Sequence, residues 1–184
     1  MKKLFTLFTV WIFSMAGYSQ VFDWEWQNPL PQGNNLVKVV ALSPTNVLLF
    51  GNTSVILRTD NGGSTWSIKY PDTLQRNILS ADFVDQNIGY LSGQNGLLMK
   101  TVDGGLTWQY LNSGVTVNLN DIDFFDADTG YAVGASGTMI KTTNGGANWI
   151  NVTNPVTVAI NTIFIQSPNN VYMGTASGTS PRVN

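Results

Sequence analysis

The sequence has 184 residues, of which 43% are hydrophobic and 11% are charged, and its formal net charge is −2. The apolar content argues against a disordered chain, and nine Lys and Arg residues do not supply the basic face that a nucleic-acid binder needs. The absence of His and Cys excludes imidazole bases, thiol nucleophiles, disulfides and the metal sites that depend on them. We therefore expect one folded domain without a catalytic, metal or cofactor site.

Residues 1–20 have the order of a secretory signal peptide. Lys2 and Lys3 precede an apolar run from Leu4 to Met15, and small or polar residues close the segment. The apolar run is too short to span a bilayer comfortably, although a buried N-terminal helix is an alternative. The sequence predicts export to the exterior, envelope or periplasm of a bacterium.

A repeat occupies most of the remaining chain. Three segments share the pattern apolar-apolar-[Lys/Arg]-Thr-x-[Asp/Asn]-Gly-Gly-x-[Thr/Asn]-Trp, ending at Trp66, Trp108 and Trp149, which lie 42 and 41 residues apart. A fourth unit begins at Ala159 but lacks the Gly-Gly-Trp part. A period of about 40 residues is typical of a propeller blade.

Each unit contains short apolar runs bounded by Gly, Asn, Asp or Pro, which predicts strands and tight turns. In chain order we expect first strands at 36–42, 78–84, 119–125 and 159–165, and second strands at 47–51, 89–93, 130–134 and 171–174. Third strands are expected at 55–59, 97–101 and 138–142, and fourth strands start at each Trp. The sequence thus predicts an all-β fold, a β-propeller of four-stranded antiparallel blades at 36–71, 77–114, 118–155 and 159–184, the last incomplete.

The segment 21–35 is predicted to be an N-terminal closing strand and linker. Trp24 precedes Val37 by the same 13 residues that separate Trp66 from Leu79, so residues 24–28 are read as an outer, fourth strand. Three full blades and part of a fourth fall short of a ring of six to eight blades. We therefore expect a fragment of a longer exported protein or, alternatively, several copies that associate through open blade edges.

The Gly-Gly turns are predicted to serve folding. Reversal with positive φ favours Gly, the preceding Asp or Asn accepts backbone N–H bonds, and the Trp buries its indole. The predicted structural positions are Thr59, Asn61, Gly63, Thr65 and Trp66, then Thr101, Asp103, Gly105, Thr107 and Trp108, then Thr142, Asn144, Gly146, Asn148 and Trp149.

The pattern Thr101-x-Asp103-x-Gly105-x-Thr107-Trp108 resembles the Asp-box, or BNR repeat, with Asn in place of Asp in the other two copies. The chain from residue 21 to about 178 is similar to secreted BNR-like propellers related to the photosystem II stability and assembly factor group. This resemblance implies a propeller fold. It leaves the function open, because Asp-boxes occur in sialidases, sortilin-type receptors and assembly factors alike.

The acidic stretch 121–128 is read as a strand-to-strand turn, with calcium binding as the alternative. A sialidase would need a cluster of three arginines that grips the substrate carboxylate, together with a Tyr nucleophile and its Glu partner. The chain has just three arginines in all, Arg58, Arg76 and Arg182, so every one of them would have to belong to that cluster. Arg58 shares its repeat position with Lys100 and Lys141 and is expected to be a strand-edge charge. We therefore predict that the chain is not an enzyme.

Tyr90 and Tyr131 occupy equivalent repeat positions, which favours packing between blades over stacking on sugars. The predicted function is a non-enzymatic binding or scaffold module whose partner is an unknown protein or glycan, with no nucleic acid and, once the signal is removed, no membrane. Loops at 52–54, 94–95 and 135–136 are candidate contact points. The alternative is a glycan-binding or sialidase-like glycosidase propeller whose catalytic part lies outside this chain.

Overall fold

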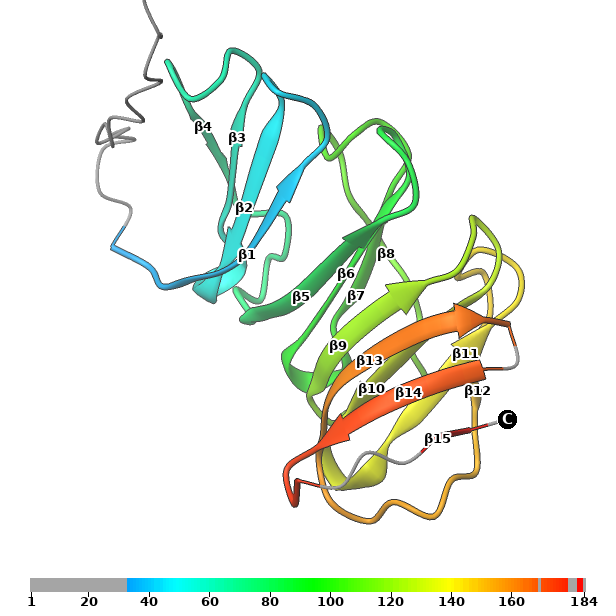
Figure 1. The fold of residues 1–184 in the computed structure, drawn as a ribbon. Coiled ribbons are helices and arrows are strands. Elements are labelled where there is room, and N and C mark those ends of the chain that lie inside the picture. The colour runs from blue at the N-terminus through cyan, green and yellow to red at the C-terminus, as the bar shows by residue number, and fades with distance from the viewer. Residues whose placement is uncertain (1–32, 169, 179–181, 184) are drawn as a thin grey trace, which may run out of the picture.

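The computed structural model describes residues 33–168, 170–178 and 182–183 (Figure 1). The described chain is all-β, and its strands form four antiparallel sheets that follow one another in chain order. The predicted signal peptide at 1–20 and the predicted closing strand at 24–28 lie outside these residues. Within them, no helix has the length and apolar character needed to cross a membrane.

Each sheet is built from one sequence repeat. The first contains β1 (Leu36–Ala41), β2 (Val47–Gly51), β3 (Ile56–Thr59) and β4 (Ser67–Lys69), and the second contains β5 (Ile78–Phe83), β6 (Gly89–Gly93), β7 (Leu98–Thr101) and β8 (Gln109–Tyr110). The third contains β9 (Leu119–Phe124), β10 (Gly130–Gly134), β11 (Met139–Thr142) and β12 (Ile150–Asn151), and the fourth contains β13 (Ile160–Ser167), β14 (Asn170–Thr175) and β15 (Arg182–Val183). The predicted architecture of four-stranded antiparallel blades is confirmed, although each outer strand begins one residue after its Trp and not at it.

The register repeats from sheet to sheet. Asp82 pairs with Tyr90 across β5 and β6, and Asp123 pairs with Tyr131 across β9 and β10. Because strand side chains alternate between the two faces of a sheet, the repeat places equivalent residues on equivalent faces. The second and third sheets therefore present one face to the preceding blade and the other to the following blade.

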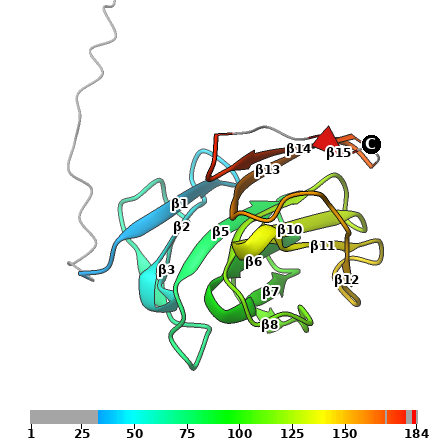
Figure 2. The ribbon, with the colours of Figure 1, turned by 90° about the horizontal axis from the view of Figure 1, so that it is seen from below.

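The apolar core lies between the sheets. Leu48 and Phe50 of the first sheet pack with Ile78 and Leu91 of the second, and the Trp108 indole meets the Phe50 ring edge-on at 5.9 Å. The first strands β1, β5, β9 and β13 lie side by side on the inner side of the arc, while β8 and β12 lie on its outer side (Figure 2). A sheet with two apolar faces needs a neighbour on each, which explains why the repeats stack.

Candidate functional site

The Asp-box turns join the third and fourth strands of the first three sheets. In each turn the buried Thr hydroxyl accepts the N–H of the second Gly, at 2.8 Å for Thr59 and 2.9 Å for Thr101 and Thr142. Both glycines of every turn have φ between 64° and 91°, a region that residues with a Cβ rarely adopt. The repeated Thr and Gly residues are thus used to close the turn.

The acidic or amide position of the box is also used inside its own turn. Asp103 Oδ1 accepts the Thr107 N–H and the Thr101 hydroxyl, both at 2.8 Å, and Asp103 Oδ2 accepts the Thr107 hydroxyl at 2.5 Å. Burial alone would raise the pKa of Asp103, but these hydrogen bonds prevail and lower it to about 2. Asn61 and Asn144 accept the corresponding backbone N–H bonds through their Oδ1 atoms at 2.9 Å.

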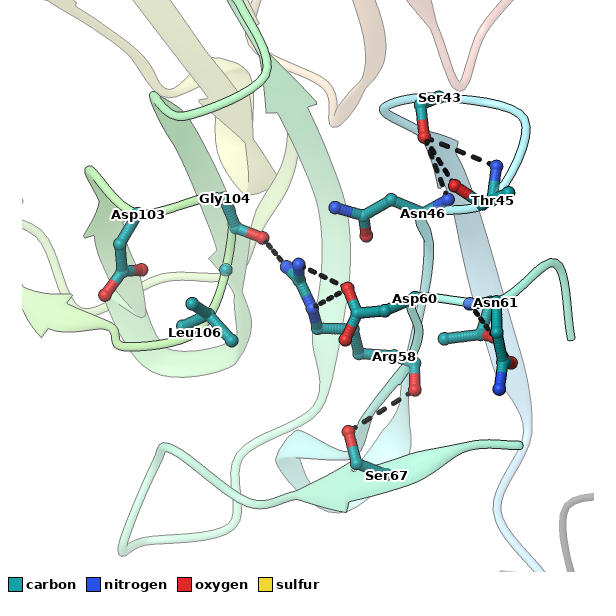
Figure 3. Close-up of polar contacts among 12 residues, drawn as sticks. Ser43, Thr45, Asn46, Arg58, Asp60, Asn61, Ser67, Asp103, Gly104 and Leu106 are labelled. Atoms are coloured by element: carbon teal, nitrogen blue, oxygen red, sulfur yellow. Dashed lines mark hydrogen bonds and ion pairs between the residues drawn. The ribbon is translucent and has the colours of Figure 1, made fainter. Parts of the chain in front are cut away.

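A basic side chain on each of two third strands reaches the Asp-box of the next blade. The Arg58 guanidinium donates to the Gly104 carbonyl and pairs with Asp60 at 2.6 Å (Figure 3). Lys100 Nζ donates to the Gly145 carbonyl at 2.9 Å. The prediction that Arg58 is a strand-edge charge is wrong, because this residue is 8% exposed and its guanidinium lies between two blades.

The equivalent tyrosines pack between blades, as their repeat positions indicated. Tyr90 stacks on Phe124 of the next blade with ring centroids 3.6 Å apart, and its hydroxyl lies 3.1 Å from the Ala127 carbonyl oxygen. Burial raises the pKa of Tyr90 to about 12. The Tyr131 hydroxyl donates to the Pro168 carbonyl at 3.3 Å. These rings are therefore part of the interface between blades.

The acidic stretch divides between a turn and the inner strand. Asp126 Oδ1 accepts the N–H groups of Asp128 and Thr129 at 2.9 and 2.6 Å, which fixes the exposed turn between β9 and β10 and lowers the Asp126 pKa. Among the described residues, no group of three acidic side chains is placed to hold a metal ion. The carboxylates of Asp121 and Asp123 instead turn towards neighbouring blades.

Three inner-strand carboxylates bridge adjacent blades. Asp82 Oδ2 accepts the N–H of Phe124 at 2.9 Å, Asp123 Oδ2 accepts that of Ile165 at 2.6 Å, and Asp121 Oδ2 accepts that of Ile163 at 2.9 Å. The sequence reasoning missed this role. The available signal was the recurrence of Asp at the same repeat position, 82 and 123, in two blades.

Burial dominates the electrostatics of two of these carboxylates, Asp82 and Asp123. It raises the pKa of Asp82, and it raises the pKa of Asp123 to about 6, with the nearby Asp82 and Asp121 carboxylates adding to the shift at Asp123. The backbone N–H bonds oppose both shifts. Both carboxylates serve as hydrogen-bond acceptors for the backbone of the next blade.

The first interface lacks such a bridge, because Val40 stands where Asp82 and Asp123 stand in the next two blades. A groove of about 350 Å³ lies there between β1 and β5. Its lining includes Lys38, Val40, Asp82, Phe83, Asp85 and Gln86. Lys38 lies on one wall, Asp82 and Asp85 lie on the other, and Val40 and Phe83 supply apolar surface. Such a groove suits a polypeptide segment that carries both charged and apolar side chains.

The loops predicted to contact a ligand form three 3-10 turns, η1 (Asn52–Ser54), η2 (Gln94–Gly96) and η3 (Ala135–Gly137). The Asn77 and Asn118 side chains of the following blades accept the N–H groups of Thr53 and Asn95, at 2.9 and 3.2 Å. The groove extends towards the β5–β6 turn, at the other end of the sheet from η2. The role of these loops in binding stays a prediction.

Arg76 lies at the same end as the 3-10 turns. Its guanidinium pairs with the buried Asp72 at 2.9 Å, and Asp72 also accepts the Tyr110 hydroxyl at 2.6 Å. Burial raises the pKa of Asp72, but its hydrogen bonds to Arg76 and Tyr110 outweigh this effect and lower it to about 2. Arg76 and Arg58 are thus both engaged in holding the fold, and the side chain of Arg182 lies outside the described part.

The comparisons with known proteins give a consistent picture. A family profile described as photosynthesis system II assembly factor YCF48 matches residues 71–153 and 108–174, together more than half of the chain. A photosystem II assembly lipoprotein Ycf48 of Synechococcus sp. (strain CC9902) is 38% identical over 80 residues, which are 42% of this chain and 24% of that protein. The chain therefore spans about a quarter of that relative's length.

Two solved structures show the same fold at low sequence identity. A structure of YCF48 bound to D1 peptide is 18% identical with a TM-score of 0.65, and the match covers 80% of this chain and 48% of that one. The GH74 enzyme of Niastella koreensis is also 18% identical with a TM-score of 0.61, over 80% of this chain and 30% of the enzyme. Because YCF48 and a GH74 enzyme share it, the fold alone does not determine the activity.

Proposed function

The chain belongs to the photosynthesis system II assembly factor YCF48 family, and from this membership we propose that it is a non-enzymatic propeller that binds a protein partner. The partner enters as an extended peptide segment in the groove between β1 and β5. The observation that carries the proposal is this groove, which opens between the first two described sheets, where Val40 replaces the inter-blade carboxylate. A solved member of the family holds a D1 peptide, which supports peptide binding as the mode.

The groove offers the contacts that a peptide needs. Its two walls come from β1 and β5, which are edge strands of their sheets and so suit main-chain pairing with an added strand, and its apolar residues accept side chains. Lys38 attracts an acidic residue or a C-terminal carboxylate, while Asp85 attracts a basic one. A peptide with an acidic group near a short apolar run fits this arrangement.

A hydrolase is the less favoured function. The three inner-strand carboxylates already accept backbone N–H bonds, so none is placed as a general acid beside a second, unengaged carboxylate. The glycan-binding or glycosidase alternative is tested with a glycan array and a fluorogenic sialoside. We expect no glycan signal above background and no turnover.

Peptide selection tests the proposal directly. Peptides are selected from a random twelve-residue phage library on the immobilised protein, and the best sequence is synthesised for fluorescence anisotropy. Lys38→Glu reverses the charge of the groove and should raise the dissociation constant about tenfold. Lys69→Glu makes the same charge change on the outer strand β4 and should change it less than twofold.

Failure to enrich any peptide, or equal binding by wild type and the Lys38→Glu variant, would contradict the proposal. Export to a bacterial envelope or exterior belongs to the same proposal and rests on the signal-peptide pattern of residues 1–20. It is tested by locating the protein after cell fractionation and by sequencing its mature N-terminus, which should begin within one or two residues of Ser19 or Gln20.

A further inference from the structure

Among the described residues, the first and the fourth sheets each have one face that no neighbouring sheet covers. On the first sheet, Leu36 is 43% exposed, whereas Ile78, Leu119 and Ile160 at the same repeat position are fully buried. Val39 is 63% exposed, whereas its counterparts in the next three sheets are at most 6% exposed. These residues belong to the face that each later sheet packs against the sheet before it.

The fourth sheet exposes the opposite face. Tyr172 is 40% exposed, whereas Tyr90 and Tyr131 at its repeat position are 0% and 4% exposed because the next blade covers them. Phe164 pairs with Tyr172 across β13 and β14 and is 61% exposed. A hollow of about 350 Å³ lies over these residues, with Thr162 and Gly174 at its border.

We propose that a second copy of this chain covers these faces, with the first sheet of one copy packed on the fourth sheet of the other. This contact goes beyond the proposed peptide binding, and it meets the peptide groove at β1, because Val39 and Ala41 also line that groove. In a dimer the same contact forms twice, because the first sheet of each copy packs on the fourth sheet of the other. The two copies then form a closed ring of eight sheets, a number within the usual range of propellers.

The two faces match the interface that already joins the third and fourth sheets. There the Tyr131 hydroxyl donates to the Pro168 carbonyl in a Ser-Pro-x-Asn turn. The corresponding turn of the first sheet, 43–46, has the same Ser-Pro-x-Asn pattern. The Tyr172 hydroxyl donates to Gln166 Oε1 at 3.3 Å within its own sheet, and in the proposed contact it exchanges this acceptor for the Pro44 carbonyl of the other copy, the counterpart of Pro168.

The side-chain volumes also compensate. Within the chain, the Asp82 carboxylate reaches the backbone N–H of Phe124 and the Asp123 carboxylate that of Ile165, so the smaller residue approaches the strand position that carries the larger one. At the proposed contact this order is inverted, because the large Phe164 faces the small, exposed Ala41, which corresponds to Phe124 and Ile165. Such complementary changes are what close packing between two surfaces requires.

Sedimentation velocity and light scattering of the purified protein over a range of concentrations test the proposal. We expect a dimer with twice the mass measured for the denatured chain. Phe164→Asp should raise the dimer dissociation constant about tenfold or more. Adding Ala41→Ile should bring the dissociation constant back to within about threefold of the wild-type value. The Asp at 164 and the Ile at 41 then reproduce the Asp123–Ile165 contact of the third interface, and the cross-strand neighbour of residue 41, Val47, already matches Val171, the neighbour of Ile165.

Leu74→Asp is the matched control, since Leu74 is 73% exposed in the connection before β5, and the dimer should be unchanged. Circular dichroism of each variant establishes that it is folded. A monomer at all concentrations would overturn the proposal and indicate that another polypeptide segment covers the faces. A dimer indifferent to Phe164→Asp, or one that Ala41→Ile fails to restore, would overturn it as well.

Discussion

Asp121 connects three blades, and replacing it by Asn should destabilise the fold markedly. Its Oδ1 accepts the Ser80 hydroxyl at 2.6 Å and the Ile122 N–H at 3.0 Å. Its Oδ2 accepts the Thr162 hydroxyl and the Ile163 N–H, both at 2.9 Å. An amide has nearly the same shape but must present N–H₂ to one of these two pairs of donors.

The magnitude follows from that mismatch. The hydroxyl of the affected pair can rotate and accept a hydrogen bond from the new N–H₂ group, whereas the backbone N–H cannot. One backbone N–H, that of Ile122 or that of Ile163, therefore loses its acceptor, at a cost of about 1–3 kcal/mol. The remaining bonds lose their charge assistance, and we expect a total loss of about 2–4 kcal/mol. Asp126→Asn, which changes an exposed turn carboxylate, should cost less than about 1 kcal/mol.

Urea unfolding followed by tryptophan fluorescence measures both variants. The slope of the transition reports whether each variant still unfolds as one unit. An Asp121→Asn protein within about 0.5 kcal/mol of wild type would refute the view that this carboxylate holds three blades together.

Three further predictions concern titration and turn geometry. Because burial holds the Asp123 pKa at about 6, above its unfolded value, stability should fall as the pH rises from about 4 to 6, and Asp123→Asn should reduce this fall in pH-dependent urea titrations. Asp72 has the opposite sign, since its pKa of about 2 implies stability that is lost as the pH falls from about 4 to 2, a loss that Asp72→Asn should lack. Gly105→Ala should lower the free energy of unfolding by about 2 kcal/mol or more, because the added Cβ overlaps Leu48 Cδ2 at φ 85°, whereas Gly62→Ala, with its nearest neighbour at 3.8 Å, should cost about 1 kcal/mol.

The repeat made the architecture predictable from sequence. The second strands at 47–51, 89–93 and 130–134 were predicted with the bounds that the structure has, because each is a short run that ends at a Gly and follows a turn segment. The third strand of the fourth sheet, β15, was not predicted, because no apolar-Lys-Thr pattern precedes it. Local patterns thus identified every strand that carried the repeat signature.

The contacts between blades were harder to predict. The sequence predicts an edge charge at Arg58 because it does not tell which neighbour a strand residue meets, and the acceptor of Arg58, the Gly104 carbonyl, lies 46 residues away. The groove at Val40 is likewise defined by a difference between blades, and its depth depends on how two sheets pack. Such features follow from tertiary geometry, which single-strand patterns do not encode.

Amide hydrogen exchange of Phe124, Ile163 and Ile165 tests most directly whether the repeats stack as described. These N–H groups lie on inner strands and bond to carboxylates of the preceding blade, Asp82, Asp121 and Asp123. We expect all three to exchange slowly, close to the rate set by global unfolding, and to lose that protection when the matching Asp is replaced by Ala. Exchange as fast as in an unstructured peptide in the wild-type protein would contradict the packing of one blade on the next.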